Sequence, residues 1–199
     1  MKKTLSLLFA LTGWFAIITQ YVLMIRNSEF SFWETTIRFF SYFTILTNII
    51  VAVYFTVQTL KKSSNEKSGI LTAITVYISI VGLIYQFLLR STWNPSGMQK
   101  LVDELLHSVI PLLVLIYWYW YENKNNLKYG SILKWAIYPV LYLGYILIRG
   151  SFSGFYPYPF VDVASFGLTN VLINALWITA FFFILSLVFI KIGKLTGKG

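Results

Sequence analysis

Six apolar runs, each long enough to cross a bilayer as a helix, constrain this chain more than any other feature of its sequence. They cover about residues 5–24, 36–60, 69–89, 102–121, 131–148 and 168–190. Hydrophobic residues make up 57% of the 199 residues and charged residues only 12%, which is more apolar surface than a soluble domain of this size buries. The sequence therefore predicts an all-α integral membrane protein, a six-transmembrane-helix bundle that forms a single membrane domain over residues 1–199.

The cations predict the orientation of this bundle, because loops rich in Lys and Arg stay in the cytoplasm. Six spans place both termini on one side, and that side carries eleven cations: Lys2, Lys3, Lys61, Lys62, Lys67, Lys124, Lys128, Lys134, Lys191, Lys194 and Lys198. The other side carries five: Arg26, Arg38, Arg90, Lys100 and Arg149. We expect both termini in the cytoplasm and the chain in the inner (plasma) membrane. Basic residues scattered over short loops do not favour a nucleic-acid partner.

Cysteine is absent and histidine occurs once, so a protein-ligated transition metal is not expected and no cofactor is predicted. The single histidine, His107, lies inside the fourth apolar run. Hydrocarbon cannot solvate an imidazole, so an ionisable residue at this depth is a functional candidate. The alternative is a satisfied packing residue. Pro111 weakens that alternative, because it cannot donate to the His107 carbonyl and loosens the helix beside the ring.

Asp103 precedes His107 by one helical turn and Glu104 precedes it by three residues. A carboxylate on the same helix face can fix the tautomer of the imidazole, as the acid does in hydrolytic triads. The alternative is that Asp103 only marks the water boundary. At 1.5 Å per residue, His107 is expected roughly 8 Å below the outer end of its span. Thr44, about two turns into the second span, falls at a similar depth.

Polar residues gather in the outer halves of the predicted spans, whereas the inner halves are almost entirely aliphatic and aromatic. The polar set comprises Thr19, Gln20, Thr44, Thr47, Asn48, Gln86, His107, Asn170 and Asn174. Such segregation favours a polar pocket open to the outer leaflet. For single residues there are ordinary alternatives, because a membrane Thr often bonds its own helix and a membrane Asn often joins two helices.

The outer loops are rich in aromatic residues and proline, above all residues 149–162, which contain Tyr156 and Tyr158. They are expected either to fold over a cavity or to form an interfacial aromatic belt. Arg90 and Arg149 are candidates for binding a fatty-acid carboxylate or a head-group phosphate, or are interface anchors. The predicted substrate-binding residues are therefore Asn48, Gln86, Arg90, Arg149, Tyr156, Tyr158, Asn170 and Asn174.

A hydroxyl and an imidazole at one depth are the minimum for nucleophilic acyl transfer. A Thr hydroxyl is a weak nucleophile unless a neighbouring base takes its proton as it attacks a carbonyl. In this hypothesis Thr44 attacks, His107 is the base, Asp103 orients His107, and Asn48 or Asn170 donates to the oxyanion. The spacing alone does not show that Thr44 and His107 meet.

Three motifs carry a resemblance to a bacterial family of small six-span membrane proteins. The stretch Phe43-Thr44…Thr47-Asn48 resembles that family's FT…(S/T)N helix, and Leu106-His107-Ser108-Val109-Ile110-Pro111 resembles its histidine helix. Tyr138-Pro139, Arg149-Gly150 and the Tyr-Pro-Tyr-Pro-Phe loop at 156–160 resemble its third signature. The match covers nearly the whole chain.

More distantly, the Tyr-Phe-Thr and His-x-Val-x-Pro elements are similar to those of the eukaryotic androgen-induced and androgen-dependent TFPI-regulating membrane proteins. Those are threonine hydrolases that cleave fatty acid esters of hydroxy fatty acids. The resemblance implies that Thr44, rather than Thr47, is the nucleophile and that His107 is its partner. The Tyr-Pro-Tyr-Pro-Phe loop has no counterpart there, so the substrate is left open.

Two functions from different classes follow. The first is an intramembrane hydrolase of the serine/threonine type that cleaves a lipid or fatty-acid ester entering from the outer leaflet. The second is a non-catalytic membrane protein that binds a lipid or another small molecule, such as a transporter subunit or a sensor. The second keeps the pocket and lacks the chemistry, so it predicts that Thr44 and His107 lie too far apart to share a proton.

Overall fold

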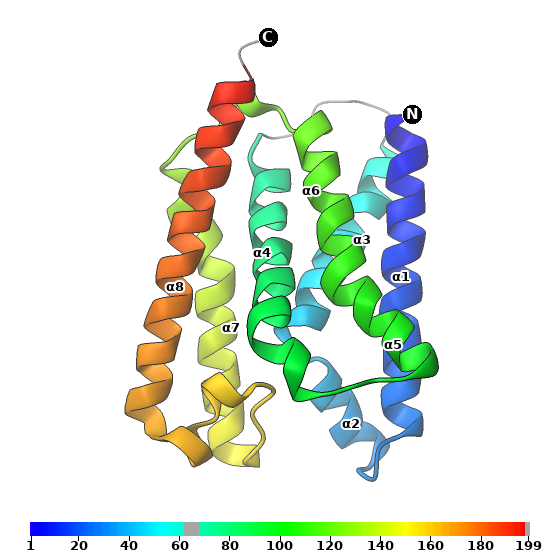
Figure 1. Cartoon of the computed structure of the whole chain (residues 1–199), viewed down its shortest axis with the longest axis vertical. Coiled ribbons are helices and arrows are strands. Elements are labelled where there is room, and N and C mark those ends of the chain that lie inside the picture. The colour runs from blue at the N-terminus through cyan, green and yellow to red at the C-terminus, as the bar shows by residue number, and fades with distance from the viewer. Residues whose placement is uncertain (62–67, 198–199) are drawn as a thin grey trace. The chain divides into compact units, whose positions relative to one another are not determined.

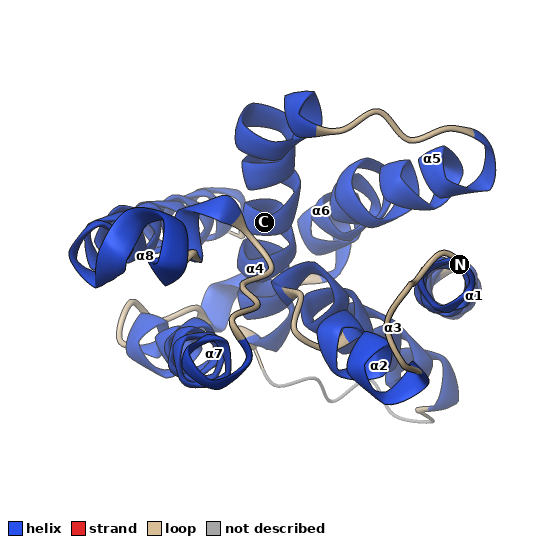
Figure 2. Ribbon diagram, turned by 90° about the horizontal axis from the view of Figure 1, so that it is seen from below, coloured by secondary structure: helices blue, strands red, loops and turns tan. Residues whose placement is uncertain are grey.

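The computed structural model describes residues 1–61 and 68–197, and within these ranges every regular element is a helix (Figure 2). Six helical segments are long and apolar enough to cross a membrane: Lys2–Arg26, Phe43–Leu60, Ile70–Thr92, Gly97–Tyr121, Ser131–Ser153 and Val163–Thr196. The predicted all-helical class and the six apolar spans are confirmed. Lys62, Lys67 and Lys198, which entered the charge argument, lie outside the described residues.

The chain divides into two compact units, Met1–Asn123 and Lys124–Gly199. The helices of the first unit, labelled in Figure 1, are α1 (Lys2–Arg26), α2 (Phe32–Phe39), α3 (Phe43–Leu60), α4 (Ile70–Ile84), α5 (Gly97–Glu104) and α6 (Ile110–Tyr121). Two π-helices interrupt this series: η1 (Tyr85–Leu89) follows α4, and η3 (Leu105–Val109) joins α5 to α6. A short 3₁₀ turn, η2 (Arg90–Thr92), follows η1 and ends the apolar helical segment that begins with α4. The single domain predicted for residues 1–199 stays a prediction.

The predicted continuous span over residues 36–60 is wrong at its start, because a non-helical turn separates α2, which ends at Phe39, from α3, which begins at Phe43. Ser31 caps α2 by accepting a hydrogen bond from the Glu34 amide at 3.3 Å. After α2 the backbone tightens into a turn, and Tyr42 then adopts an extended conformation with φ −82° and ψ 125°. Thr44 is therefore the second residue of α3 rather than a residue two turns into a helix.

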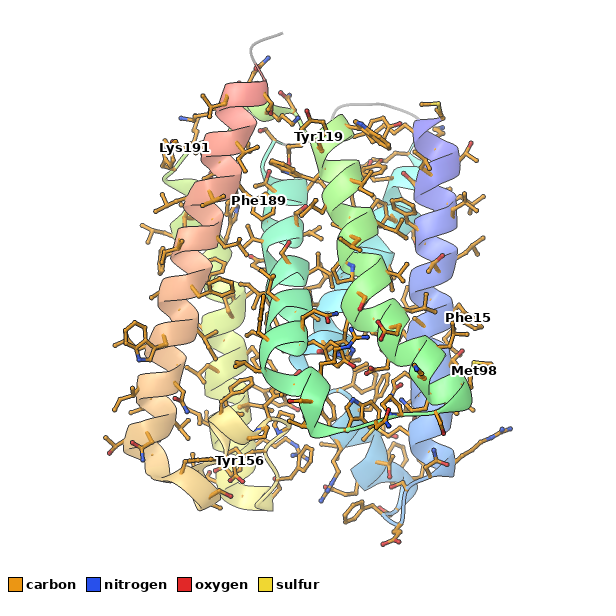
Figure 3. All side chains as sticks on the ribbon, viewed as in Figure 1. Phe15, Met98, Tyr119, Tyr156, Phe189 and Lys191 are labelled. Carbon is orange, nitrogen blue, oxygen red and sulfur yellow. The ribbon has the colours of Figure 1, made fainter. Side chains whose placement is uncertain are left out.

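Close packing of α1 on α3 builds one side of the first unit. A Cβ added at Gly13 would lie 3.1 Å from the Cβ of Ala52, so the two backbones approach closely at this point. Trp14 Nε1 donates to the Thr56 hydroxyl at 3.1 Å, which satisfies an indole that lipid would leave unpaired. Phe15 on α1 and Met98 on α5 are about half exposed and point outward (Figure 3), as expected for side chains that face lipid.

Glu122, just after α6, satisfies the amino-terminal end of α4. Its carboxylate accepts hydrogen bonds from the Gly69 amide at 3.2 Å, from the Thr72 amide at 2.8 Å and from the Thr72 hydroxyl at 2.7 Å. Trp118 Nε1 donates to the same Thr72 hydroxyl at 2.8 Å. A carboxylate at this end of a helix is favoured by the free amides and by the helix dipole. It fixes α4 against α6, which are the two helices that carry the π-helical turns.

The second unit contains η4 (Lys124–Asn126), α7 (Ser131–Ser153), η5 (Pro159–Val161) and α8 (Val163–Thr196). Its core is formed by Ile146, Val161 and Val171, with the rings of the 156–160 loop packed around them. Tyr156, labelled in Figure 3, lies over Gly150: a Cβ added at Gly150 would fall 2.0 Å from the Tyr156 ring. Gly150 thus leaves the space that the Tyr156 ring fills, because any larger residue would place its Cβ inside that ring.

Asp162 begins α8 as its amino-terminal cap. One carboxylate oxygen accepts from the amides of Ala164 and Ser165, and the other accepts from the Ser165 hydroxyl. The hydrogen bond from that hydroxyl lowers the pKa of Asp162, so the cap is charged at neutral pH. One turn later Gly167, at φ 74° and ψ 154°, kinks α8, a conformation that a residue with a side chain adopts only with strain.

We expect Gly150→Ala to destabilise the protein by about 1–3 kcal/mol, because the added methyl group displaces a packed aromatic ring. Gly144→Ala on the same helix is the matched control. Nothing lies within 4 Å of the Cβ that it adds, and alanine favours the helix by about 0.5–1 kcal/mol. Thermal unfolding of the purified protein in detergent measures both. Equal unfolding temperatures for the two variants would contradict the role given to Gly150.

Candidate functional site

His107 lies in the π-helix η3, at the point where α5 passes into α6. Pro111 has no amide hydrogen, so an α-helix would leave the His107 carbonyl without its partner four residues on. Directly opposite is Gly82 of α4, where an added Cβ would lie 3.2 Å from that carbonyl oxygen. The second π-helix, η1, continues α4 from Tyr85. π-helical turns occur mostly as single interruptions of α-helices, and frequently at functional sites.

Two oxygen atoms of Asp103 lie within 3.1 Å of one nitrogen of the imidazole. Nδ1 of His107 lies 3.1 Å from the Asp103 carboxylate and 3.0 Å from the main-chain oxygen of the same residue. Both neighbours are acceptors, so we assign the proton to Nδ1, which leaves the lone pair on Nε2. Asp103 is 3% exposed. The i, i+4 contact predicted from the sequence is thus present, and Asp103 is buried.

Tyr85 contacts both members of this pair from the neighbouring helix. Its ring is stacked on the His107 ring, with centroids 4.1 Å apart and planes 13° from parallel. Its hydroxyl donates to the Asp103 carboxylate oxygen that His107 does not use. The buried carboxylate therefore accepts a hydrogen bond from Tyr85 on one oxygen and has His107 Nδ1 3.1 Å from the other, while the hydrogen bond of Nδ1 joins it to the main-chain oxygen of Asp103. We call His107, Asp103 and Tyr85 the imidazole cluster.

A second set of polar side chains is centred on Glu104, the residue after Asp103, and is more exposed than the imidazole cluster. Glu104 forms an ion pair with Arg90 through one oxygen, and its other oxygen accepts from the Ser108 hydroxyl at 2.7 Å. Gln86 closes the ring: its amide nitrogen donates to Ser108 at 2.8 Å, and its oxygen accepts from Arg90 at 2.7 Å. Two adjacent carboxylates therefore have separate partners. Gln86 and Arg90, predicted to bind substrate, bind each other.

Asn48 joins the helix that carries Thr44 to the helix that carries His107. Its amide nitrogen donates to the Thr44 carbonyl at 2.9 Å and to the Leu106 carbonyl at 3.3 Å. The main chain at Thr44 and the main chain next to His107 therefore lie on either side of one amide group. Thr44 is 8% exposed and Asn48 is fully buried.

This geometry changes the role expected for Asn48. Both hydrogens of its amide are committed to carbonyls, so it has none to donate to an oxyanion. The reverse assignment of its oxygen and nitrogen would set an acceptor against two acceptors, so the observed orientation is the favoured one. Its oxygen is buried and has no hydrogen-bond partner among the described residues. Asn48 thus offers an acceptor, suited to a hydroxyl or a water, and not a donor.

The other predicted binding residues belong to the second unit and make contacts within it. Arg149 donates to the Ser153 hydroxyl and the Phe155 carbonyl, and Tyr158 is stacked on Phe160. Asn170 donates to a carbonyl of its own helix, and Asn174 donates to the carbonyl of Phe160. Tyr156 packs on Gly150. The substrate contacts proposed for these five residues stay predictions.

The sequence did not indicate Tyr85 as a partner of His107. It also did not indicate the polar ring, by which we mean the hydrogen-bonded set of Gln86, Arg90, Glu104 and Ser108. Asp103 was found because it lies on the same helix, at a spacing that brings side chains together. Tyr85 lies on another helix, and spacing gives no information about that pairing. Among the described residues, no group of three or more His, Cys, Asp or Glu side chains gathers to hold a metal ion.

Comparisons with known protein families, with curated proteins and with solved structures found no match for this chain. The family resemblance drawn from the sequence motifs therefore stays a prediction. The site rests on its own geometry: a half-buried imidazole in contact with a carboxylate on its own helix and with a tyrosine on another, and a threonine at the start of a third helix.

We expect Asn48→Asp to destabilise the protein more than Asn48→Leu. The aspartate sets a second acceptor against the two carbonyls that Asn48 binds, whereas leucine only loses the hydrogen bonds, at about 1–3 kcal/mol for the unpaired groups. Thermal unfolding in detergent measures both variants.

Asn170→Asp is the matched control, because Asn170 is exposed and bonds only one carbonyl of its own helix in the described contacts. A cost for Asn48→Asp no larger than that of the control would contradict the bridging role of Asn48.

Proposed function

We propose that this protein is an intramembrane threonine hydrolase that cleaves a lipid or fatty-acid ester. Thr44 is the nucleophile, His107 the general base and acid, and Asp103 the residue that orients His107. The observation that carries the proposal is the contact of His107 Nδ1 with the buried Asp103 carboxylate at 3.1 Å. In hydrolytic triads a carboxylate on one ring nitrogen fixes the tautomer, so that the other nitrogen can take a proton.

The position of Thr44 supports its role as nucleophile. Thr44 is the second residue of α3, an 18-residue helix, and the amino-terminal end of a helix favours negative charge. An oxyanion that develops when Thr44 attacks a carbonyl would lie at this end. Asn48 ties the main chain of Thr44 to that of Leu106, the neighbour of His107. The hydroxyl and the imidazole are thereby carried by chain segments that one side chain holds together.

The reaction proceeds in two half-reactions. Thr44 Oγ attacks the ester carbonyl carbon while His107 Nε2 takes its proton, and the tetrahedral intermediate then expels the alcohol, which takes the proton back from Nε2. Water next attacks the acyl-threonine ester with His107 again as the base. The carboxylic acid leaves and the Thr44 hydroxyl is restored. The lone acceptor on Asn48 is suited to hold this water or a hydroxyl of the substrate.

The apolar surroundings and the family resemblance support an ester with a long acyl chain as the substrate. Arg90 lies 5.8 Å from the centre of the Tyr85 ring in the imidazole cluster, and it binds Glu104 and Gln86. We propose that a fatty-acid carboxylate or a head-group phosphate competes with Glu104 for this guanidinium. We further propose that the substrate enters from the outer leaflet of the plasma membrane and that both termini lie in the cytoplasm, on the basis of the eleven cations against five.

We expect a fluorophosphonate probe to label the purified protein and Thr44→Ala to abolish the labelling. Thr44→Ser should retain it, because a serine hydroxyl replaces the threonine hydroxyl. Thr47→Ala is the matched control: Thr47 is also buried in α3, one turn away, and its loss should leave the labelling intact. Hydrolysis of a fluorogenic fatty-acid ester in the same samples should fall by about 10²–10⁴ in His107→Gln, the usual contribution of a general base.

Labelling that survives Thr44→Ala, or that disappears only in Thr47→Ala, would contradict this assignment. A protein that binds the ester without labelling or turnover would support the other function predicted from the sequence, non-catalytic binding of a lipid or another small molecule.

The orientation can be tested with single cysteines, because the chain has none of its own. Glu29→Cys and Lys128→Cys place a thiol at exposed positions on opposite predicted sides. In intact spheroplasts a membrane-impermeant maleimide should label Glu29→Cys, and it should label Lys128→Cys only after permeabilisation. The reverse pattern would contradict the proposed orientation.

A further inference from the structure

Tyr85 is the one side chain in the imidazole cluster that contacts both the ring and the carboxylate. It comes from η1, whereas His107 and Asp103 come from the α5–η3 segment. It is 4% exposed, so its hydroxyl must have a partner, and that partner is the second oxygen of Asp103. Neither the sequence motifs nor the family resemblance gave this residue a role.

The two contacts restrain two different motions. Asp103 and His107 lie on one helix, and an i, i+4 pair by itself leaves the carboxylate able to turn about its side-chain bonds. The Tyr85 hydroxyl fixes the second oxygen, so the carboxylate keeps its first oxygen toward Nδ1. The parallel ring, 4.1 Å from the imidazole, blocks rotation of the His107 side chain on that face. Together they keep Nε2 directed to one place.

The surrounding structure makes this arrangement rigid. Glu104, the residue after Asp103, is held by Arg90 and Ser108, and Arg90 lies 5.8 Å from the centre of the Tyr85 ring. The polar ring therefore links the end of α4 to the α5–η3 segment just beside the cluster. Both segments are π-helical at this level, which sets Tyr85 and His107 face to face.

We propose that Tyr85 is a positioning residue that holds Asp103 and His107 in the geometry in which Nδ1 carries the proton and Nε2 accepts one. This inference rests on the proposed function for its effect on turnover, but its effect on the imidazole does not depend on catalysis. Tyr85 acts through Asp103 and His107, so it should alter kcat and leave KM nearly unchanged.

The single histidine makes a direct test possible, because ring-¹⁵N-histidine labelling of the full-length protein in detergent gives the signals of His107 alone. In the unaltered protein we expect the ¹⁵N shifts of one tautomer, protonated on Nδ1, and ring-proton shifts moved upfield by the stacked tyrosine. Tyr85→Phe should keep the upfield shift and reduce the population of that tautomer. Tyr85→Leu should lose both signatures.

On the fluorogenic ester, Tyr85→Phe should lower kcat about tenfold or more, the usual effect of losing one hydrogen bond to a charged group. Tyr85→Leu should lower it further, with KM nearly constant in both. Tyr77→Phe is the control for the same substitution in the preceding α4 helix, and it should leave the His107 signals unchanged.

The outcomes separate the two proposals. His107 signals that are the same in the unaltered protein, Tyr85→Phe and Tyr85→Leu would overturn the positioning role, even if Thr44 is labelled. Signals that change as expected, in a protein that neither labels nor turns over, would support the positioning of the imidazole and contradict the hydrolase. A parallel rise of KM in both variants would also overturn the positioning role, because it would place Tyr85 against the substrate.

Discussion

An imidazole in a helical segment apolar enough to cross a membrane needs protein partners, and in the first unit of this protein Asp103 and Tyr85 supply them. The main-chain oxygen of Asp103 binds Nδ1 of His107, the Asp103 carboxylate lies 3.1 Å from the same nitrogen, and the Tyr85 hydroxyl donates to the second carboxylate oxygen. The buried carboxylate would be costly without the Tyr85 donor and the nearby imidazole. At this level α4 and α5 both continue into π-helical turns, and Gly82 lies against the His107 carbonyl.

The same arrangement accounts for the chemistry proposed for the site. A carboxylate that holds Nδ1 leaves Nε2 as the nitrogen that can exchange a proton with Thr44. Asn48 joins the start of α3 to the π-helix that carries His107. The three helical segments are thus connected by side chains, and burial strengthens the hydrogen bonds that these side chains make.

Much of the fold was predictable from the sequence, because lipid leaves few options: a long apolar run must be a helix. The Asp103–His107 contact was predictable as well, because it is local. The break at Phe40–Tyr42 was not, since the residues next to it, Phe39 and Phe43, are apolar and only the turn geometry separates α2 from α3. Tyr85 was also out of reach, because its partners lie on another helix. Asn48 was singled out as a substrate-binding residue, which stays a prediction, and its observed role as an amide donor to two carbonyls depends on packing that the sequence does not record.

The most direct test is to map the site of covalent modification by mass spectrometry after reaction with a fluorophosphonate. The account predicts a single adduct on the peptide that contains Thr44, with fragment ions that assign it to that residue, and its loss in His107→Gln. An adduct on Thr47 or on a serine outside α3, or an adduct on Thr44 that forms equally well without His107, would contradict the pairing of this hydroxyl with this imidazole.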